Sequence, residues 1–133
     1  MSEHRIRLRG AWQCHFREGD PVEGTEVVRR VDLPCKWPDD LPGRIQLIRQ
    51  FGKPPIDLQI ERMALELVQI RGLLAGWLNG SSLVRVKDQS NCWSVKLPEP
   101  FLLRNTLVLD LDLDEARQSD SSWGEISLLI RPR

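Results

Sequence analysis

The side chains in this sequence that are best suited to bind a polar ligand are aromatic. The chain has five tryptophans and no tyrosine. Flat aromatic rings stack on the apolar faces of sugars, and neighbouring polar side chains then hydrogen-bond the hydroxyl groups. Trp37 lies between two prolines and Trp123 follows two serines, so both are expected in loops, where they serve either packing or ligand binding.

The other three tryptophans belong to strand-like or turn-flanking segments. Trp12 alternates with Cys14 and Phe16, which predicts a core position. Trp77 lies beside an Asn-Gly turn and is expected to cover the surface of a sheet, whereas Trp93 fits either role. An arginine can hydrogen-bond the hydroxyl groups of a sugar whose ring is stacked on an aromatic side chain. The predicted ligand-binding set is therefore Trp37, Arg49, Trp93 and Trp123.

Acidic residues recur at every second position as Asp110, Asp112 and Asp114, followed by Glu115. Hard cations bind several carboxylate oxygens at once. On a strand, however, these acids would be spread over ~13 Å along one face. The glycine that an EF-hand loop requires after its third acid is also missing. We therefore expect a solvated sheet face and no metal site.

Patterns for catalysis are scarce. Cys14 and His15 are neighbours, so on a strand their side chains point to opposite faces and cannot easily form a dyad. His4 and His15 are the only histidines, which leaves little material for a zinc site. The sequence offers no Ser-His-Asp arrangement, phosphate loop or dinucleotide fingerprint. We expect a protein with neither enzymatic activity nor a cofactor.

The overall composition is that of a globular protein, with 41% hydrophobic and 29% charged residues. A length of 133 residues predicts one domain, residues 1–133. Lys and Arg together number 19, as do Asp and Glu, so the formal net charge is zero. A neutral chain generates no long-range attraction toward phosphates, which argues against nucleic acid as the main partner.

The sequence also carries information on the cellular compartment of the protein. The polar start MSEHRIRLRG lacks the apolar stretch of a secretory signal. No run approaches the ~20 apolar residues that span a bilayer, so no membrane partner is expected. Cys14, Cys35 and Cys92 cannot all pair with one another, and without an export signal they are expected to be reduced thiols in the cytoplasm.

The elements that must position these side chains are strands. Apolar residues alternate with polar ones in short segments, and Gly, Pro, Asn or Asp separate the segments every 8–12 residues, as is typical of an all-β sandwich or barrel. Helical periodicity is limited to one turn from Leu113 to Arg117. The predicted strands cover residues 5–9, 12–17, 26–33, 44–51, 84–88, 92–97, 106–113 and 125–131, with a further strand pair within residues 62–83.

Residues 62–83 form the central landmark of this pattern. An apolar strand, a short turn at Arg71-Gly72 and a second strand are expected, followed by a tight turn at Asn79-Gly80. Asn-Gly favours the two positive φ angles of a type I′ hairpin turn. We therefore expect Asn79 and Gly80 to serve backbone geometry and to fix strand register.

The order of motifs along the chain resembles the N-terminal sugar-binding domain of β-galactosidases and β-glucuronidases. The likeness covers nearly the whole chain, although no single motif is specific. The matching motifs are Leu8-x-Gly10-x-Trp12, Val31-x-Leu33-Pro34-x-x-Trp37, Arg49-x-Phe51, Glu61-Arg62-x-x-Leu65, Trp77-Leu78-Asn79-Gly80, Arg104-Asn105-x-Leu107-x-Leu109 and Gly124-x-Ile126-x-Leu128-x-Ile130.

This resemblance implies a jelly-roll β-sandwich of the galactose-binding-like type, with about eight to ten mostly antiparallel strands. It also implies that the (β/α)₈ barrel with the two catalytic carboxylates of those enzymes is missing here. The expected function is a non-catalytic module that binds a saccharide in the loops at one end of the sandwich. The alternative is a protein-interaction or structural module, which would use a sheet face or an edge strand to pair with another protein or with a second copy of itself.

Overall fold

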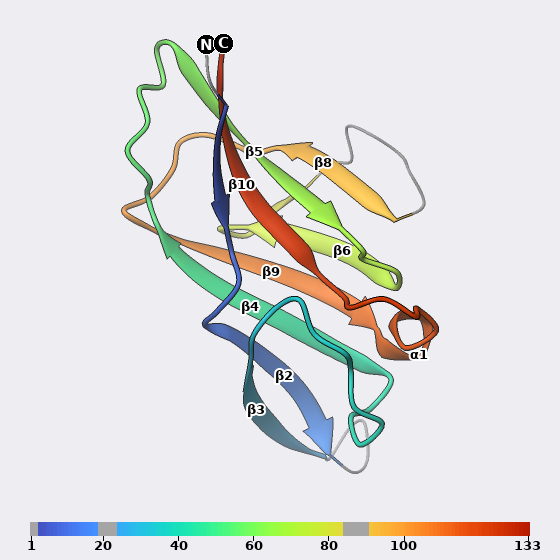
Figure 1. The fold of residues 1–133 in the computed structure, drawn as a ribbon. Coiled ribbons are helices and arrows are strands. Elements are labelled where there is room, and N and C mark those ends of the chain that lie inside the picture. The colour runs from blue at the N-terminus through green and yellow to red at the C-terminus, as the bar shows by residue number, and fades with distance from the viewer. Residues whose placement is uncertain (1–2, 19–23, 84–90) are drawn as a thin grey trace.

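The computed structural model describes residues 3–18, 24–83 and 91–133. These residues form two sheets, of four and six strands, in which all neighbouring strands are antiparallel. The sheets pack face to face as two layers (Figure 1). The predicted all-β sandwich is therefore confirmed.

The bounds of the strands follow the predicted segments closely. A single helical turn, α1 (Leu113–Ala116), follows β9, as expected from the sequence. The smaller sheet contains, in spatial order, β1 (His4–Arg7), β10 (Glu125–Pro132), β5 (Glu61–Val68) and β8 (Cys92–Lys96). The larger sheet contains β3 (Thr25–Val31), β2 (Trp12–Glu18), β4 (Arg44–Gly52), β9 (Arg104–Asp112), β6 (Leu73–Leu78) and β7 (Ser81–Ser82).

The core lies between the two sheets because each strand directs every second side chain inward. Leu107, Leu109 and Leu111 of β9 are completely buried, as the alternation in the sequence predicts. From the smaller sheet, Leu65 and Leu128 belong to the same apolar cluster. The two sheets therefore share one core.

The strand pair predicted within residues 62–83 is only partly confirmed. The Asn79-Gly80 turn joins β6 to β7 as a hairpin, with φ angles of 51° and 84° at its two residues. In contrast, β5 and β6 do not pair with each other, since β5 belongs to the smaller sheet and β6 to the larger. The turn at Arg71-Gly72 therefore links the two layers, a connection that local sequence does not distinguish from a hairpin.

One other detail differs from the prediction. β9 ends at Asp112, whose side chain caps α1 by accepting the backbone N–H of Asp114 at 3.0 Å, so Asp114 is helical and does not lie on the strand. The strand predicted over residues 84–88 lies outside the described residues. Among the described residues, no helix is long and apolar enough to cross a membrane.

Candidate functional site

Trp37 and Trp123 are brought together by the fold. Their rings meet edge to face, with centroids 5.7 Å apart. The backbones of Cys35 and Trp123 form a two-way bridge, and the Trp123 indole donates to the carbonyl oxygen of Arg71 at 2.8 Å. Both tryptophans lie in connecting segments as predicted, but only 9% of Trp37 and 1% of Trp123 are exposed. Their rings are used for packing, which leaves little ring face for stacking on a sugar.

The remaining tryptophans are distributed over both sheets. Trp12 is completely buried, which confirms its predicted core position. Trp77 is partly buried on β6. Trp93 is buried on β8, opposite Leu67 of β5. Like Trp12, Trp93 therefore belongs to the buried core of the sandwich.

Arg49 has the most unusual environment of the four predicted residues. Arg49 lies two residues from the buried Leu47 and two from the buried Phe51 on β4. Its side chain therefore starts from the same, core-facing side of the sheet. The Nε atom donates to the carbonyl oxygen of Gly10 at 2.6 Å, and Nη1 donates to the carbonyl oxygen of Gln50. Partial burial lowers the pKa of Arg49 from its ordinary value. A guanidinium in such a place carries a desolvated positive charge.

Arg49 lines a pocket with a volume of about 420 Å³, which we name the Arg49 pocket. Two more arginines contribute to it, namely Arg7 from β1 and Arg104 from the start of β9. Arg104 donates from Nε to the side-chain oxygen of Gln50 at 2.5 Å. The apolar part of the lining comes from Ile6, Leu8, Phe51, Pro54, Pro55 and Leu128.

The positive charge of the Arg49 pocket is not balanced locally. No carboxylate is among the described residues that line it. Within the same described part of the chain, Arg7, Arg49 and Arg104 form no ion pair. Three arginines therefore line one pocket without a described carboxylate beside them, a composition that favours an anionic or strongly accepting ligand.

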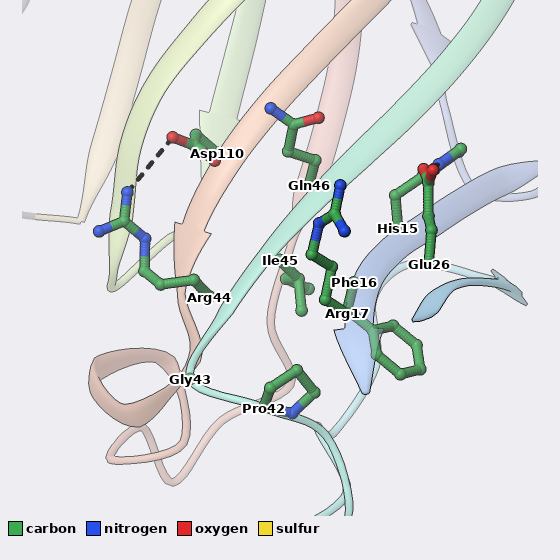
Figure 2. A pocket seen from close by; sticks show the side chains of 10 residues that line it. All are labelled: His15, Phe16, Arg17, Glu26, Pro42, Gly43, Arg44, Ile45, Gln46 and Asp110. Carbon is green, nitrogen blue, oxygen red and sulfur yellow. Dashed lines mark hydrogen bonds and ion pairs between the residues drawn. The ribbon is translucent and has the colours of Figure 1, made fainter. Parts of the chain in front are cut away.

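A second hollow lies on the outer face of the larger sheet, with a volume of about 650 Å³. Figure 2 shows its polar side chains, which come from β2, β3, β4 and β9. Here two acidic residues, Glu26 and Asp110, balance two arginines, Arg17 and Arg44. His15 lies 3.2 Å from the carboxylate of Glu26, and Arg44 lies 3.5 Å from that of Asp110. This outer-face hollow therefore has less unsatisfied charge to offer a ligand than the Arg49 pocket.

The acidic residues near the C-terminus each have a separate partner. Asp110 pairs with Arg44, Asp112 caps α1, and Asp114 pairs with Arg117 at 3.3 Å. Among the described residues, no group of three or more His, Cys, Asp or Glu side chains is arranged to hold a metal ion. These acids therefore serve local ion pairing and helix capping.

The two further arginines of the Arg49 pocket, Arg7 and Arg104, were not among the predicted site residues. Arg7 alternates with Ile6 and Leu8 in the first predicted strand, and Arg104 starts a motif that was assigned only to the fold. Each arginine looks like an ordinary solvent-facing residue in the sequence. Their shared pocket depends on β1, β4 and β9 coming together, which no local pattern reveals.

Comparisons with known proteins give a result only at the level of structure. No protein-family model matches the chain. No curated protein matches its sequence either. Among solved structures, an FMN-binding β-glucuronidase from Facaelibacterium prausnitzii L2-6 matches with a TM-score of 0.68 and 17% identity, over 98% of this chain and 23% of that chain. The chain shares a fold with part of that enzyme.

Two further solved structures agree with this result. A β-glucuronidase from Ruminococcus gnavus in complex with D-glucaro-1,5-lactone gives a TM-score of 0.66 at 14% identity, over 98% of this chain and 29% of that chain. A GH2 β-galacturonidase from Eisenbergiella tayi bound to glycerol gives a TM-score of 0.63 at 15% identity, over 96% of this chain and 24% of that chain. The resemblance predicted from the motifs is thereby confirmed for the fold. This chain spans less than a third of each of these enzymes.

Proposed function

We propose that this chain is a non-catalytic binding module and that its ligand is an acidic saccharide held in the Arg49 pocket. One observation carries the proposal: Arg7, Arg49 and Arg104 line a single pocket whose described lining contains no carboxylate. A guanidinium presents N–H donors in a planar fork that matches a carboxylate in two-point contact. A ligand carboxylate would balance the positive charge of this pocket.

The rest of the lining suits a sugar ring. Ile6 and Pro55 provide apolar surface beside the arginines, and the side-chain amide of Gln50 adds a polar group. Sugar sites combine apolar contact with a few fixed hydrogen-bonding groups in this way. The volume of about 420 Å³ is within the range of small-molecule pockets.

The solved structures that share the fold support an acidic sugar. They include enzymes named as β-glucuronidases and β-galacturonidases, and one structure of the latter is bound to galacturonate. Hydrolysis of a glycoside requires two carboxyl groups placed on either side of the scissile bond. The described lining of the Arg49 pocket offers arginines and an amide instead, so we assign it binding and not hydrolysis.

Isothermal titration calorimetry at low salt tests this function with galacturonate and glucuronate as ligands and with galactose and glucose as neutral controls. We expect the two acids to bind at least about tenfold more tightly than the neutral sugars, because a charge-assisted two-point contact is roughly twice as strong as a neutral one. Arg49→Gln and Arg104→Gln should each abolish this preference. Arg44→Gln, in the outer-face hollow, should leave it unchanged. Equal affinity for acidic and neutral sugars, or no heat with any of them, would refute the assignment.

A further inference from the structure

β3 occupies one edge of the larger sheet. It pairs with β2 on one side, and no described strand lies on its other side. Figure 1 shows β3 at the margin of the sandwich. An edge strand directs the backbone N–H and C=O groups of alternate residues outward, where they can pair with a further strand. With seven residues, β3 is the longest edge strand among the described residues.

The side chains on the outer face of β3 follow a symmetrical pattern. Glu26, Val28 and Arg30 share this face because they lie at every second position. Val28 is 53% exposed and is one of five large apolar side chains that are exposed among the described residues. The acidic and the basic residue are equally distant from Val28 in sequence, and both are exposed. The pattern is therefore self-complementary when the strand is reversed about Val28.

We propose that β3 pairs antiparallel with β3 of a second copy of this chain, in the register centred on Val28. In this register Glu26 of each copy lies opposite Arg30 of the other copy, and the two Val28 side chains lie against each other. Opposite charges placed directly across two strands stabilise the pairing, whereas like charges oppose it. The contact is two-fold and closes on itself, so it yields a dimer with a continuous sheet of twelve strands in place of an open fibre.

The other edge strands lack this complementarity. Reversing β1 about Ile6 would place Arg5 opposite Arg7, which brings like charges together. Reversing β8 about Ser94 would place Cys92 opposite Lys96, which creates no ion pair. β7 has only two residues. Among the described edges, β3 alone combines length, an exposed apolar centre and opposite charges at matched positions.

The charges on β3 also explain why the pairing would be selective. Charged side chains on edge strands normally prevent indiscriminate association, because a foreign strand must bury or oppose them. A reversed copy of β3 instead places an opposite charge across from both Glu26 and Arg30. One seven-residue strand pair makes a small interface, so we expect a dissociation constant on the order of 10–100 µM, typical of transient contacts. This dimer does not depend on the Arg49 pocket.

Sedimentation velocity of the full chain from ~1 µM to ~1 mM tests the proposal across the range of such weak contacts. We expect a monomer at the low end and a dimer at the high end. Glu26→Arg alone and Arg30→Glu alone should each remain monomeric, because each places like charges opposite one another. An equimolar mixture of these two variants should form a heterodimer, and the double variant Glu26→Arg/Arg30→Glu should recover the homodimer.

Two controls separate a loss of pairing from a loss of folding. Circular dichroism and thermal unfolding show which variants are folded, and Val28→Lys supplies an independent disruption by placing two cations at the centre of the contact. A monomer for the unchanged chain at every concentration would overturn the proposal. So would folded single variants that dimerise like the unchanged chain, or a mixture of the two that shows no heterodimer.

Discussion

The side-chain amide nitrogen of Asn79 donates to the side-chain oxygen of Asn105 across 3.0 Å. The oxygen of Asn79 accepts the backbone N–H of Thr106 at 2.8 Å. Asn105 is completely buried and also bonds both the backbone N–H and the carbonyl oxygen of Leu102, at 3.0 Å each. Two side-chain amides therefore join the β6–β7 turn to the segment that leads into β9.

Asn105→Ala is expected to lower the free energy of unfolding by about 2–4 kcal/mol, because it removes a completely buried amide and leaves the backbone N–H and C=O of Leu102 and the amide of Asn79 without this partner. Asn79→Gly retains the positive φ angle of the turn and is expected to cost about 1–2 kcal/mol, since the buried oxygen of Asn105 keeps the N–H of Leu102 as a donor and only the N–H of Thr106 loses its side-chain acceptor. Urea denaturation of both variants checks this order. A smaller loss for Asn105→Ala than for Asn79→Gly would contradict the role given to the buried amide.

Gly72 and Gly80 both have positive φ angles, of 88° and 84°, but differ in the space around them. A Cβ at Gly72 would clash with the carbonyl oxygen of Asp112, whereas a Cβ at Gly80 would have nothing within 4 Å. Gly80→Ala should cost about 1–2 kcal/mol for the left-handed backbone alone. Gly72→Ala should cost about 3–5 kcal/mol, because the backbone at the end of β9 must also move. Thermal unfolding of the two variants measures the difference, and equal losses would show that the close approach is unimportant.

Trp37 and Trp123 pack against each other but differ in hydrogen bonding. The buried indole N–H of Trp37 has no partner among the described residues, whereas that of Trp123 donates to Arg71. Trp123→Phe should therefore destabilise the protein by about 1 kcal/mol more than Trp37→Phe, since it leaves the carbonyl group of Arg71 without this donor. Chemical denaturation monitored by fluorescence gives both values. The reverse order would indicate that the Trp37 indole N–H has an acceptor.

Stability is expected to fall at alkaline pH because of two thiols. Burial raises the pKa of the Cys14 thiol to about 11 and that of the Cys35 thiol to about 11, compared with 9.0 for an unperturbed thiol. Between about pH 9 and pH 11 the unfolded chain releases protons that the folded chain retains, so the free energy of unfolding decreases as pH rises through this window. The sequence contains no tyrosine to titrate there.

Denaturation curves from pH 8 to pH 11 measure this slope. Cys14 is completely buried, and its own contribution amounts to about 2 kcal/mol across the window. Cys14→Ala should therefore flatten the pH dependence, whatever its effect on stability at neutral pH. An unchanged slope in this variant would show that the Cys14 thiol does not control the alkaline loss.

Much of the fold could be predicted because strands that bury one face alternate visibly in the sequence. Leu107, Leu109 and Leu111 marked β9 in this way, and Asn79-Gly80 marked the β6–β7 turn. The assignment of β5 and β6 to different sheets could not be predicted, because a short turn between two apolar strands has the same local sequence whether the strands pair or cross between layers. Sheet membership is decided by distant partners such as β10 and β9.

The candidate site could be predicted only in part. The alternation of residues 44–51 puts Arg49 on the same face as the buried Leu47 and Phe51, which is an uncommon position for a charged side chain. The burial of Trp37 and Trp123 depends on the contact between two loops that are far apart in sequence, so their loop positions alone suggested more exposure than the structure shows. Arg7 and Arg104 became site residues only through the meeting of β1, β4 and β9.

The crossing from β5 to β6 also has a consequence for the order of folding. Only residues 69–72 separate two strands that belong to opposite layers, and Gly72 ties the turn to β9 through a backbone hydrogen bond of 2.8 Å to Asp112. Closing so short a loop costs little chain entropy, and contacts between near neighbours form faster than those between distant segments. Residues 69–72 thus hold β5 and β6, and with them the two layers, close together early in folding. We expect this connection to be structured in the folding transition state before β1 pairs with β10.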